Sequence, residues 1–170
     1  QDLVKHLPFE TQAYQPVVHF INGEFWGIIN MRERYDQYYI ASHYNLEPDD
    51  VVIMEAWGSI DVGTPQDRTL FYDILSYAES NNMALPTHYD WVKQRVDIES
   101  LAQFYAAQIY FQNTDWPQNN MTFWRSRSGE WHENAAPGKD GRWRWMLYDA
   151  DFGMNLYGSN QTHNGLSRVM

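Results

Sequence analysis

Polar side chains that could carry chemistry gather in two segments, each of which directly follows an expected helix or strand. Asp115, Asn119 and Asn120 come after a long helical pattern, and Asp149 and Asp151 come after a strand-like run. Segments at the ends of regular elements often hold binding and catalytic groups. Carboxylate and amide oxygens are ligands for hard divalent cations such as Mg²⁺, which makes metal-dependent chemistry the first possibility.

Asp149 and Asp151 are two residues apart, so both carboxylates point to one face if the strand continues through them. Two unpaired carboxylates at that distance repel each other, and a cation between them would remove the repulsion. Alternatively, Asp149 caps the following turn and Asp151 forms an ion pair with Arg142 or Arg144. The spacing alone leaves both interpretations open.

The order of the two segments is more informative than either one. A helix is followed by Asp115, by Asn120 five residues later, by two short expected strands, and by residues 151–153, which read Asp-Phe-Gly. Protein kinases arrange their catalytic loop and their metal-binding loop in this order. In those enzymes the first Asp orients the attacking hydroxyl and accepts its proton, while the Asn and the last Asp hold the ions that bridge the nucleotide phosphates.

Regular elements must position these segments, and the sequence predicts both strands and helices. Residues 16–33 form two β-rich runs around Asn22 and Gly23, a pair that tolerates the positive φ of a tight turn, and this pattern predicts a β-hairpin. A short helix is expected over 36–44, capped by its first residue. The apolar run 51–54 is expected to be a buried strand.

Three further helices are predicted. Thr64, Pro65 and Asp67 form a capping signal for a helix over 65–80. A helix capped by Thr87 is expected to end near residue 95, and one capped by Asp97 is expected to end near residue 113. The expected inner face of the first helix consists of Leu70, Phe71, Ile74, Leu75 and Ala78.

The last third of the chain is expected to hold two strands, over 121–125 and 142–148, joined by the polar connection 126–141. The tail from residue 154 onward is rich in Gly, Asn and Ser, and a loop is expected there. Trp116, Trp143 and Trp145 are expected in the core, because aromatic residues in such segments are usually buried.

Composition excludes several classes of function. The chain has 170 residues, enough for one domain, and no cysteine. It carries 12 basic and 22 acidic residues, a net charge of −10, so nucleic acid is not an expected partner. No run of about 18 apolar residues is present, so no membrane span is predicted. The six histidines are scattered without metal-ligand spacing, and no histidine-based zinc site is expected.

Three segments, in the right order and spacing, resemble the CotH-type (spore-coat-protein-H-like) atypical protein kinase family. They are residues 20–28 with Arg32 and Glu33, residues 108–120, and residues 143–153. The resemblance covers most of the chain. It implies a single domain over 1–170 with an α+β, divergent protein-kinase-like fold, mostly the C-lobe-like part together with a β-hairpin from the N-lobe side.

The resemblance also implies an activity. It implies an atypical kinase that binds ATP with Mg²⁺ or Mn²⁺ and transfers the γ-phosphoryl group to Ser or Thr of a protein. Asp115 is similar to the catalytic Asp of the family, Asn120 to the Asn of the catalytic loop, and Asp151 to the metal-binding Asp. Asp149 joins this expected metal site through its spacing from Asp151.

Arg32 and Glu33 end the expected hairpin, where they could reach the nucleotide or form a surface ion pair. Kinases also place a lysine on the α- and β-phosphates. The three lysines here, Lys5, Lys93 and Lys139, do not fall on a suitable strand. We therefore expect such a lysine upstream of this segment, with the domain truncated at its N-terminus.

Two other functions stay open at this point. A kinase-like fold without transfer activity could serve as a binding module for peptide or glycan at the bacterial cell surface. An acid–base hydrolase could use Asp115 and Asp151 as paired carboxylates, although this reaction gives no role to the two Asn residues. The resemblance suggests a bacterial protein, outside the cytoplasm, and the sequence predicts no particular protein substrate.

Overall fold

The computed structural model describes residues 1–154, 156 and 164–168, and it is a mixed α+β fold. Its centre is a five-stranded sheet in the order β1-β7-β6-β4-β5. The short strand β1 runs parallel to β7, and the other neighbours are antiparallel. The strands are β1 (Glu10–Thr11), β4 (Val51–Glu55), β5 (Ser59–Val62), β6 (Thr122–Ser126) and β7 (Arg144–Leu147).

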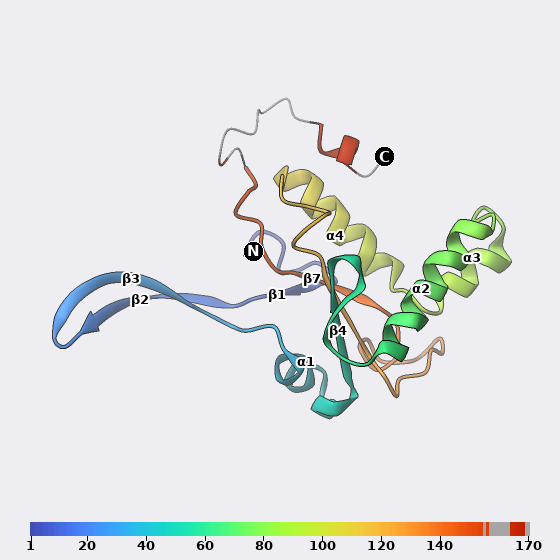
Figure 1. Cartoon of the computed structure of the whole chain (residues 1–170), viewed down its shortest axis with the longest axis horizontal. Coiled ribbons are helices and arrows are strands. Elements are labelled where there is room, and N and C mark those ends of the chain that lie inside the picture. Colours follow the sequence, from blue (N-terminus) through green and yellow to red (C-terminus); the bar gives the residue numbers. More distant parts are fainter. Residues whose placement is uncertain (155, 157–163, 169–170) are drawn as a thin grey trace.

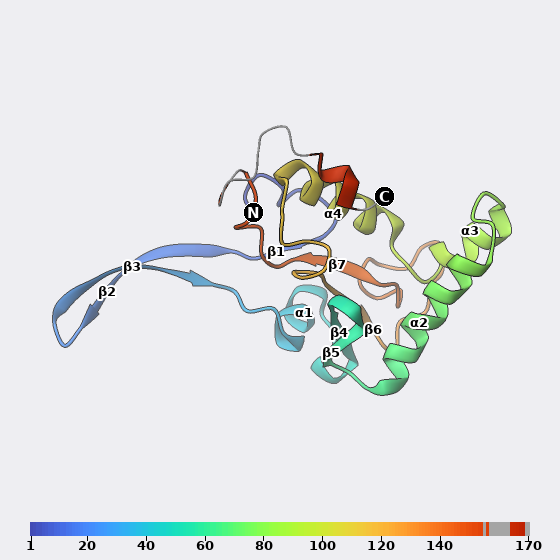
Figure 2. The same cartoon turned by 45° about the horizontal axis from the view of Figure 1, so that its top comes forward.

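Helices cover the sheet on both faces, and Figure 2 shows α1 and α4 on opposite sides of it. Alternate residues of one strand therefore enter different cores. Val52 and Met54 of β4 pack with residues of α2 and α4, whereas Val51 and Ile53 pack with residues of α1. The predicted strand 51–54 is confirmed, and its burial on both faces explains its unbroken apolar sequence.

Side-chain caps fix the starts of three helices. Asp36 accepts hydrogen bonds from two backbone amides of α1 (Gln37–Tyr44). The carboxylate of Asp67 accepts from the backbone N and the hydroxyl of Thr64, just before α2 (Pro65–Ser80). Asp97 accepts from the backbone N of Ser100 in α4 (Ile98–Phe111). These three starts are confirmed.

The fourth helix, α3 (Pro86–Lys93), begins one residue before the predicted cap. Leu85, not Thr87, precedes the first helical residue. Proline at this position lacks only an N–H that has no partner within the helix, and its fixed φ suits the first turn. Among the described residues no helix is both long and apolar enough to cross a membrane.

Two predictions need correction, one of burial and one of strand length. The inner face of α2 is narrower than predicted, because only Phe71 and Ile74 of the five residues are buried, and Leu70 and Leu75 are 48% and 41% exposed. The strand predicted over 142–148 is shorter, since β7 spans Arg144–Leu147, and every residue of β7 is buried. Trp143 and Trp145 are buried as predicted, as is Trp116.

Buried arginines join the outer elements to the sheet. Arg144 of β7 is 4% exposed and binds Asp140 at 2.6 Å and Asp97 at 2.8 Å, so it links the start of α4 to the strand. Asp67 of α2 pairs with Arg125 of β6 at 3.7 Å and with Arg127 at 3.1 Å. A buried charge is stable only when it is paired and hydrogen-bonded in this way.

The predicted hairpin is confirmed as β2 (Tyr14–Ile21) and β3 (Glu24–Arg32), with Asn22 and Gly23 at φ 52° and 85° in the turn. It extends away from the rest of the molecule, on the left in Figure 1. Many of its large apolar side chains are exposed, and they lie on both strands: Val18, Phe20, Ile21, Phe25, Trp26, Ile28, Ile29 and Met31.

Candidate functional site

Asn113, the second residue after α4, holds the two polar segments together. Its Nδ2 donates to the backbone carbonyl of Asp149 at 3.0 Å and to Oε1 of Gln108 at 2.9 Å. Its Oδ1 accepts from the backbone N of Asp115 at 3.0 Å. Asn113 is 1% exposed. Because both ends of one buried amide are occupied, the positions of Asp115 and Asp149 depend on the same side chain.

A second connection lies further along each segment. The backbone N and the hydroxyl of Thr114 both donate to the carbonyl of Phe152 at 3.3 Å. Gly153 approaches the end of α4 so closely that a Cβ there would lie 2.9 Å from the carbonyl oxygen of Phe111. Residues 113–115 and 149–153 therefore lie side by side, although more than 30 residues separate them in the chain.

Asp115 is half-buried and is held by two amides. Nδ2 of Asn119 donates to its Oδ1 at 2.8 Å, and Nδ2 of Asn120 donates to its Oδ2 at 3.0 Å. The three side chains line a cavity of about 380 Å³ together with Tyr148. A carboxylate oxygen has more than one acceptor position, so each can still accept a hydrogen bond from a hydroxyl group in the cavity.

Asn120 adopts φ 54°, a left-handed conformation that Asn tolerates better than most residues. This conformation ends the segment before β6 and turns the amide toward Asp115. Because the amide donates through its nitrogen, its oxygen is the atom that a hard cation would use.

Asp149 caps the turn that follows β7. Its Oδ1 accepts a hydrogen bond from the backbone N of Asp151 at 3.1 Å. The alternative ion pairs of Asp151 are absent, because the carboxylate contacts of Arg142 and Arg144 in the described part of the chain go to Asp97 and Asp140. The alternative interpretation of this spacing is therefore correct for the turn cap and wrong for the arginine pairing, and the metal site stays a prediction.

The carboxylate of Asp149 disfavours the charge of Asp151. Desolvation, followed by hydrogen bonding to Asp149 and by its charge, raises the pKa of Asp151 above the ordinary value. A neighbouring cation would favour the ionised form of Asp151.

Asp149 and Asp151 line a second cavity, of about 290 Å³, with Asn30 and Arg32 of the hairpin. Tyr148 lines this cavity as well as the cavity of Asp115. It is 49% exposed and directly precedes the acidic turn. Two cavities that meet at one tyrosine thus bring together the hairpin, the end of β7 and the segment after α4.

The family model of the CotH kinase protein matches residues 1–168, nearly the whole chain. The chain belongs to the CotH kinase protein family. Neither a curated protein nor a solved structure matches it. Membership confirms the resemblance found in the sequence.

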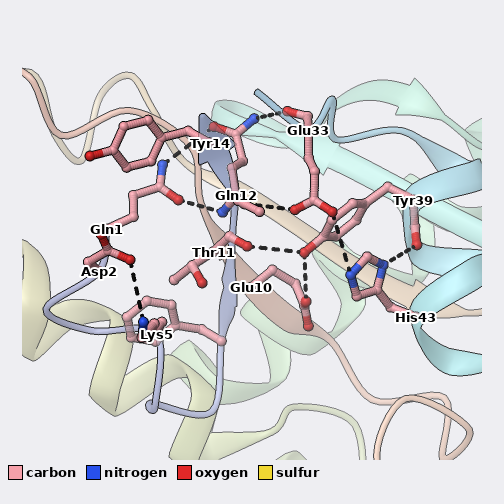
Figure 3. A pocket seen from close by; sticks show the side chains of 12 residues that line it. Gln1, Asp2, Lys5, Glu10, Thr11, Gln12, Tyr14, Glu33, Tyr39 and His43 are labelled. Carbon is pink, nitrogen blue, oxygen red and sulfur yellow. Dashed lines mark hydrogen bonds and ion pairs between the residues drawn. The ribbon is translucent and has the colours of Figure 1, made fainter. Parts of the chain in front are cut away.

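Glu33 of this CotH chain lies in a different cavity from Arg32. It lines a third cavity, of about 460 Å³, under the base of the hairpin (Figure 3). Its Oε2 accepts from the backbone N of Ala13 at 2.7 Å, and its Oε1 lies 3.9 Å from Nε2 of His43. Glu33 therefore has local partners, whereas Arg32 lies beside the acidic turn.

Within residues 1–154, 156 and 164–168 of the CotH chain, no three His, Cys, Asp or Glu side chains are grouped closely enough to hold a metal ion by themselves. The carboxylates of Asp149 and Asp151 line one cavity, and the amide of Asn120 lines the neighbouring one. Mg²⁺ usually binds proteins through one or two carboxylates and fills its shell with water and substrate phosphates, so the two carboxylates fit Mg²⁺ or Mn²⁺ in the presence of nucleotide.

Sequence reasoning did not single out Asn113, Tyr148 or Trp57 as site residues. Asn113 and Tyr148 directly follow a helix and a strand, and this position is a signal that could have found them. Trp57 lines the cavity of Asp115 from the β4–β5 connection. Its indole Nε1 donates to the carbonyl of Gln118 at 3.0 Å across 61 residues, a contact with no local signal.

Proposed function

We propose that this protein transfers the γ-phosphoryl group of ATP to Ser or Thr of a protein, with Mg²⁺ or Mn²⁺. The hairpin β2–β3 then corresponds to the N-lobe side of a kinase, and the sheet with its helices corresponds to the C-lobe-like part. Membership of the CotH kinase family supports this reaction class. The observation that carries the proposal is the pair of hydrogen bonds through which Asn113 joins Asp115 to Asp149.

Asp115 is the proposed catalytic residue. It orients the acceptor hydroxyl and takes its proton as the hydroxyl oxygen attacks phosphorus. Asn119 and Asn120 each donate to one carboxylate oxygen, so the carboxylate keeps one orientation while the hydroxyl approaches. A general base must lie within hydrogen-bond reach of the proton that it takes, and this fixed orientation supports that role.

Asp151, Asp149 and the amide oxygen of Asn120 are the proposed ligands of the metal. When bound, the metal supplies positive charge to the phosphate oxygens. Arg32 lines the cavity of the two aspartates and adds a permanent positive charge for the phosphates. Glu33, in the neighbouring cavity, is proposed to act on the nucleotide side through the base of the hairpin.

The test separates nucleotide binding from transfer. Thermal shift with ATP and Mg²⁺ or Mn²⁺ measures binding, and transfer of labelled phosphate to a mixture of Ser- and Thr-containing proteins measures activity. We expect Asp151→Ala to lose metal-dependent binding. We expect Asp115→Ala to keep binding and to lose about 10²- to 10⁴-fold in transfer, the usual contribution of a general base.

Asp61→Ala is the matched control, since Asp61 is exposed on β5. It should leave both readouts unchanged. A nucleotide shift that persists unchanged in EDTA would reject the role of the metal. Full transfer activity in Asp115→Ala would reject the catalytic assignment.

The exposed apolar residues of the hairpin favour a second candidate, a kinase-like binding module that recognises peptide or glycan at the bacterial cell surface. Strong binding to a glycan or peptide array, with no shift on adding nucleotide and metal, would support this function over phosphoryl transfer. The hydrolase is less well supported, because its reaction gives no role to Asn119 and Asn120, the two amides that hold Asp115.

A further inference from the structure

A fourth cavity, with an uncharged lining, continues from the cavity of Asp115. It has a volume of about 440 Å³, and its walls include Phe71, Tyr72 and Leu75 of α2 and Phe123 of β6. None of the described residues that line it is charged. Trp57, Gln118 and Met121 line both this cavity and the cavity of Asp115, so the two are continuous.

Trp57 is fixed at the boundary in a conformation that disfavours its residue type. Its backbone has φ 62° and ψ 21°, a left-handed geometry that is costly for a bulky residue. The hydroxyl of Tyr72 donates to its carbonyl at 2.9 Å, and its own indole donates to Gln118. Nevertheless, its side chain is 80% exposed.

Packing in the core does not explain why a tryptophan occupies position 57, because its side chain is exposed. A strained backbone that the surroundings hold in place, with a large aromatic side chain left in water, is a common arrangement where a ligand makes contact. The hydrogen bond to Gln118 ties the ring to the same segment that carries Asp115. A molecule that contacts Trp57 would therefore be positioned relative to the proposed catalytic carboxylate.

The three cavities follow one another in a fixed order. The cavity of Arg32, Asp149 and Asp151 shares Tyr148 with the cavity of Asp115, which in turn shares three residues with the uncharged cavity. The first and the last share none. In an in-line transfer the acceptor approaches from the side of the phosphoryl group opposite the leaving group. The uncharged cavity, beyond Asp115, is thus on the acceptor side.

We infer that this cavity binds a large apolar side chain of the acceptor polypeptide, with Trp57 packing against the peptide between that side chain and the phosphorylated Ser or Thr. The inference rests on the proposed phosphoryl transfer. The uncharged lining suits an aliphatic or aromatic side chain and offers no positive charge to a phosphate. The continuity with the cavity of Asp115 identifies the occupant as part of the molecule that carries the acceptor hydroxyl.

The matched variants are Leu75→Glu and Leu70→Glu. Both residues lie on α2, both are about half exposed, and Glu is a good helix former at either position. Only Leu75 lines the cavity. A second variant, Trp57→Gly, removes the exposed ring and suits the positive φ.

The probe is a peptide library with a central Ser and one flanking position at a time set to Leu, Phe, Gly or Asp. With ATP and Mn²⁺, we expect the protein to prefer Leu or Phe over Gly or Asp by about 10-fold or more at one flanking position, as apolar pockets usually discriminate. Leu75→Glu and Trp57→Gly should lose this preference, and Leu70→Glu should keep it. Phosphorylation without any apolar preference, or a preference that survives in Leu75→Glu, would overturn the inference.

Binding of the same peptides, measured by fluorescence polarisation without nucleotide, separates this inference from the proposed function. Apolar-dependent binding that is lost in Leu75→Glu, together with no phosphate transfer, would support the peptide pocket and reject the kinase. Displacement of the peptide by metal-free adenosine would identify a nucleotide-base pocket and overturn the inference. Dimerisation that Leu75→Glu abolishes would identify a second copy of the chain as the occupant, with the same consequence.

Discussion

Nδ2 of Asn113 donates to the backbone carbonyl of Asp149 across 36 residues of chain, at a distance of 3.0 Å. This bond fixes the end of β7 against the end of α4. Since Oδ1 of the same amide accepts from the backbone of Asp115, a single buried side chain sets the spacing of the two segments on which the proposed chemistry depends.

Asn113→Ala should therefore affect stability and activity together. It leaves the partly buried carbonyl of Asp149 and the partly buried backbone N–H of Asp115 without their partner, which should lower the free energy of unfolding by about 1 to 3 kcal/mol. Urea unfolding measures this loss. Asn134→Ala, at an exposed position, is the control. Phosphate transfer under conditions where the variant is fully folded should also fall, and unchanged transfer would show that the segments keep their spacing without this amide.

Asp140 should make the protein sensitive to acid. Burial alone would raise its pKa, but the hydrogen bonds and charge of Arg144, with a hydrogen bond from Arg142, lower the pKa of Asp140 to about 2. Because the folded protein holds this carboxylate ionised more strongly than the unfolded chain does, its stabilisation is fully present above about pH 4 and is lost as the pH falls toward 2.

Asp140→Asn removes that pH-dependent stabilisation and leaves Arg144 with Asp97 as its remaining carboxylate partner. We expect a loss of about 3 kcal/mol at pH 7, the low end for breaking a buried pair. We also expect a flatter decline of the melting temperature between pH 4 and pH 2. Asp90→Asn, on the exposed side of α3, should behave like the unmodified protein. An equally steep decline in Asp140→Asn would assign the acid sensitivity to other groups.

The effect of Glu10 on the pH dependence of stability should be opposite to that of Asp140. Desolvation by burial raises the pKa of this carboxyl above its ordinary value, although the hydroxyls of Tyr39 and Tyr44 donate to it. Folding is therefore favoured while the group is protonated, at pH values below the ordinary pKa of Glu, and this contribution is lost as the pH rises through the raised pKa. Above the ordinary pKa of Glu, the buried Glu10 carboxyl therefore lowers stability relative to a neutral side chain of the same shape.

Glu10→Gln should consequently raise the melting temperature at pH 7 and leave it nearly unchanged at pH 4. The amide keeps the acceptor oxygen for Tyr44 and carries no charge. Calorimetry at the two pH values measures the difference, with Glu130→Gln at an exposed position as the control. A gain in Glu10→Gln that is equal at both pH values would contradict the raised pKa.

Asp67 should be one of the most sensitive positions in α2. Its carboxylate accepts from Thr64, and it pairs with Arg125 and Arg127. Asp67→Ala removes the cap and leaves two arginines without this carboxylate, so the free energy of unfolding should fall by about 3 to 5 kcal/mol. Asp73→Ala, on the exposed face of the same helix, should change it by less than about 0.5 kcal/mol. Similar losses in both variants would mean that the pairing contributes little.

Local signals predicted most of the elements because each signal acts within a few residues. Asn22 and Gly23 supply the positive φ of the hairpin turn, and Thr64 with Asp67 supplies the start of α2. Strand β5 was missed because it follows Trp57 and Gly58, both at positive φ, and the Trp conformation is held by tertiary hydrogen bonds. No sequence pattern predicts such a conformation at a tryptophan.

The sequence predicted the order of the candidate-site residues along the chain, but it did not predict the contacts that surround them. The sequence indicated Asp115, Asn120 and Asp151 through their succession along the chain. It could not show that Arg144 is neutralised by Asp97 and Asp140, since Asp97 is 47 residues away. Nor could it show that Glu33 and Arg32, adjacent in sequence, line different cavities, because adjacent residues of an extended chain point to opposite sides.

The hairpin extends far from its base on one side, and only a short segment lies on the other side. The base of the hairpin is the pair Ala13 and Glu33, which two hydrogen bonds of 2.7 Å and 3.1 Å join. The turn between β2 and β3 is its far end (Figure 2). Arg32 is one residue from this base and lines the same cavity as Asp149. Because Arg32 lies so close to this base and the turn lies so far from it, a given change in the angle of the hairpin would displace the turn much further than the guanidinium.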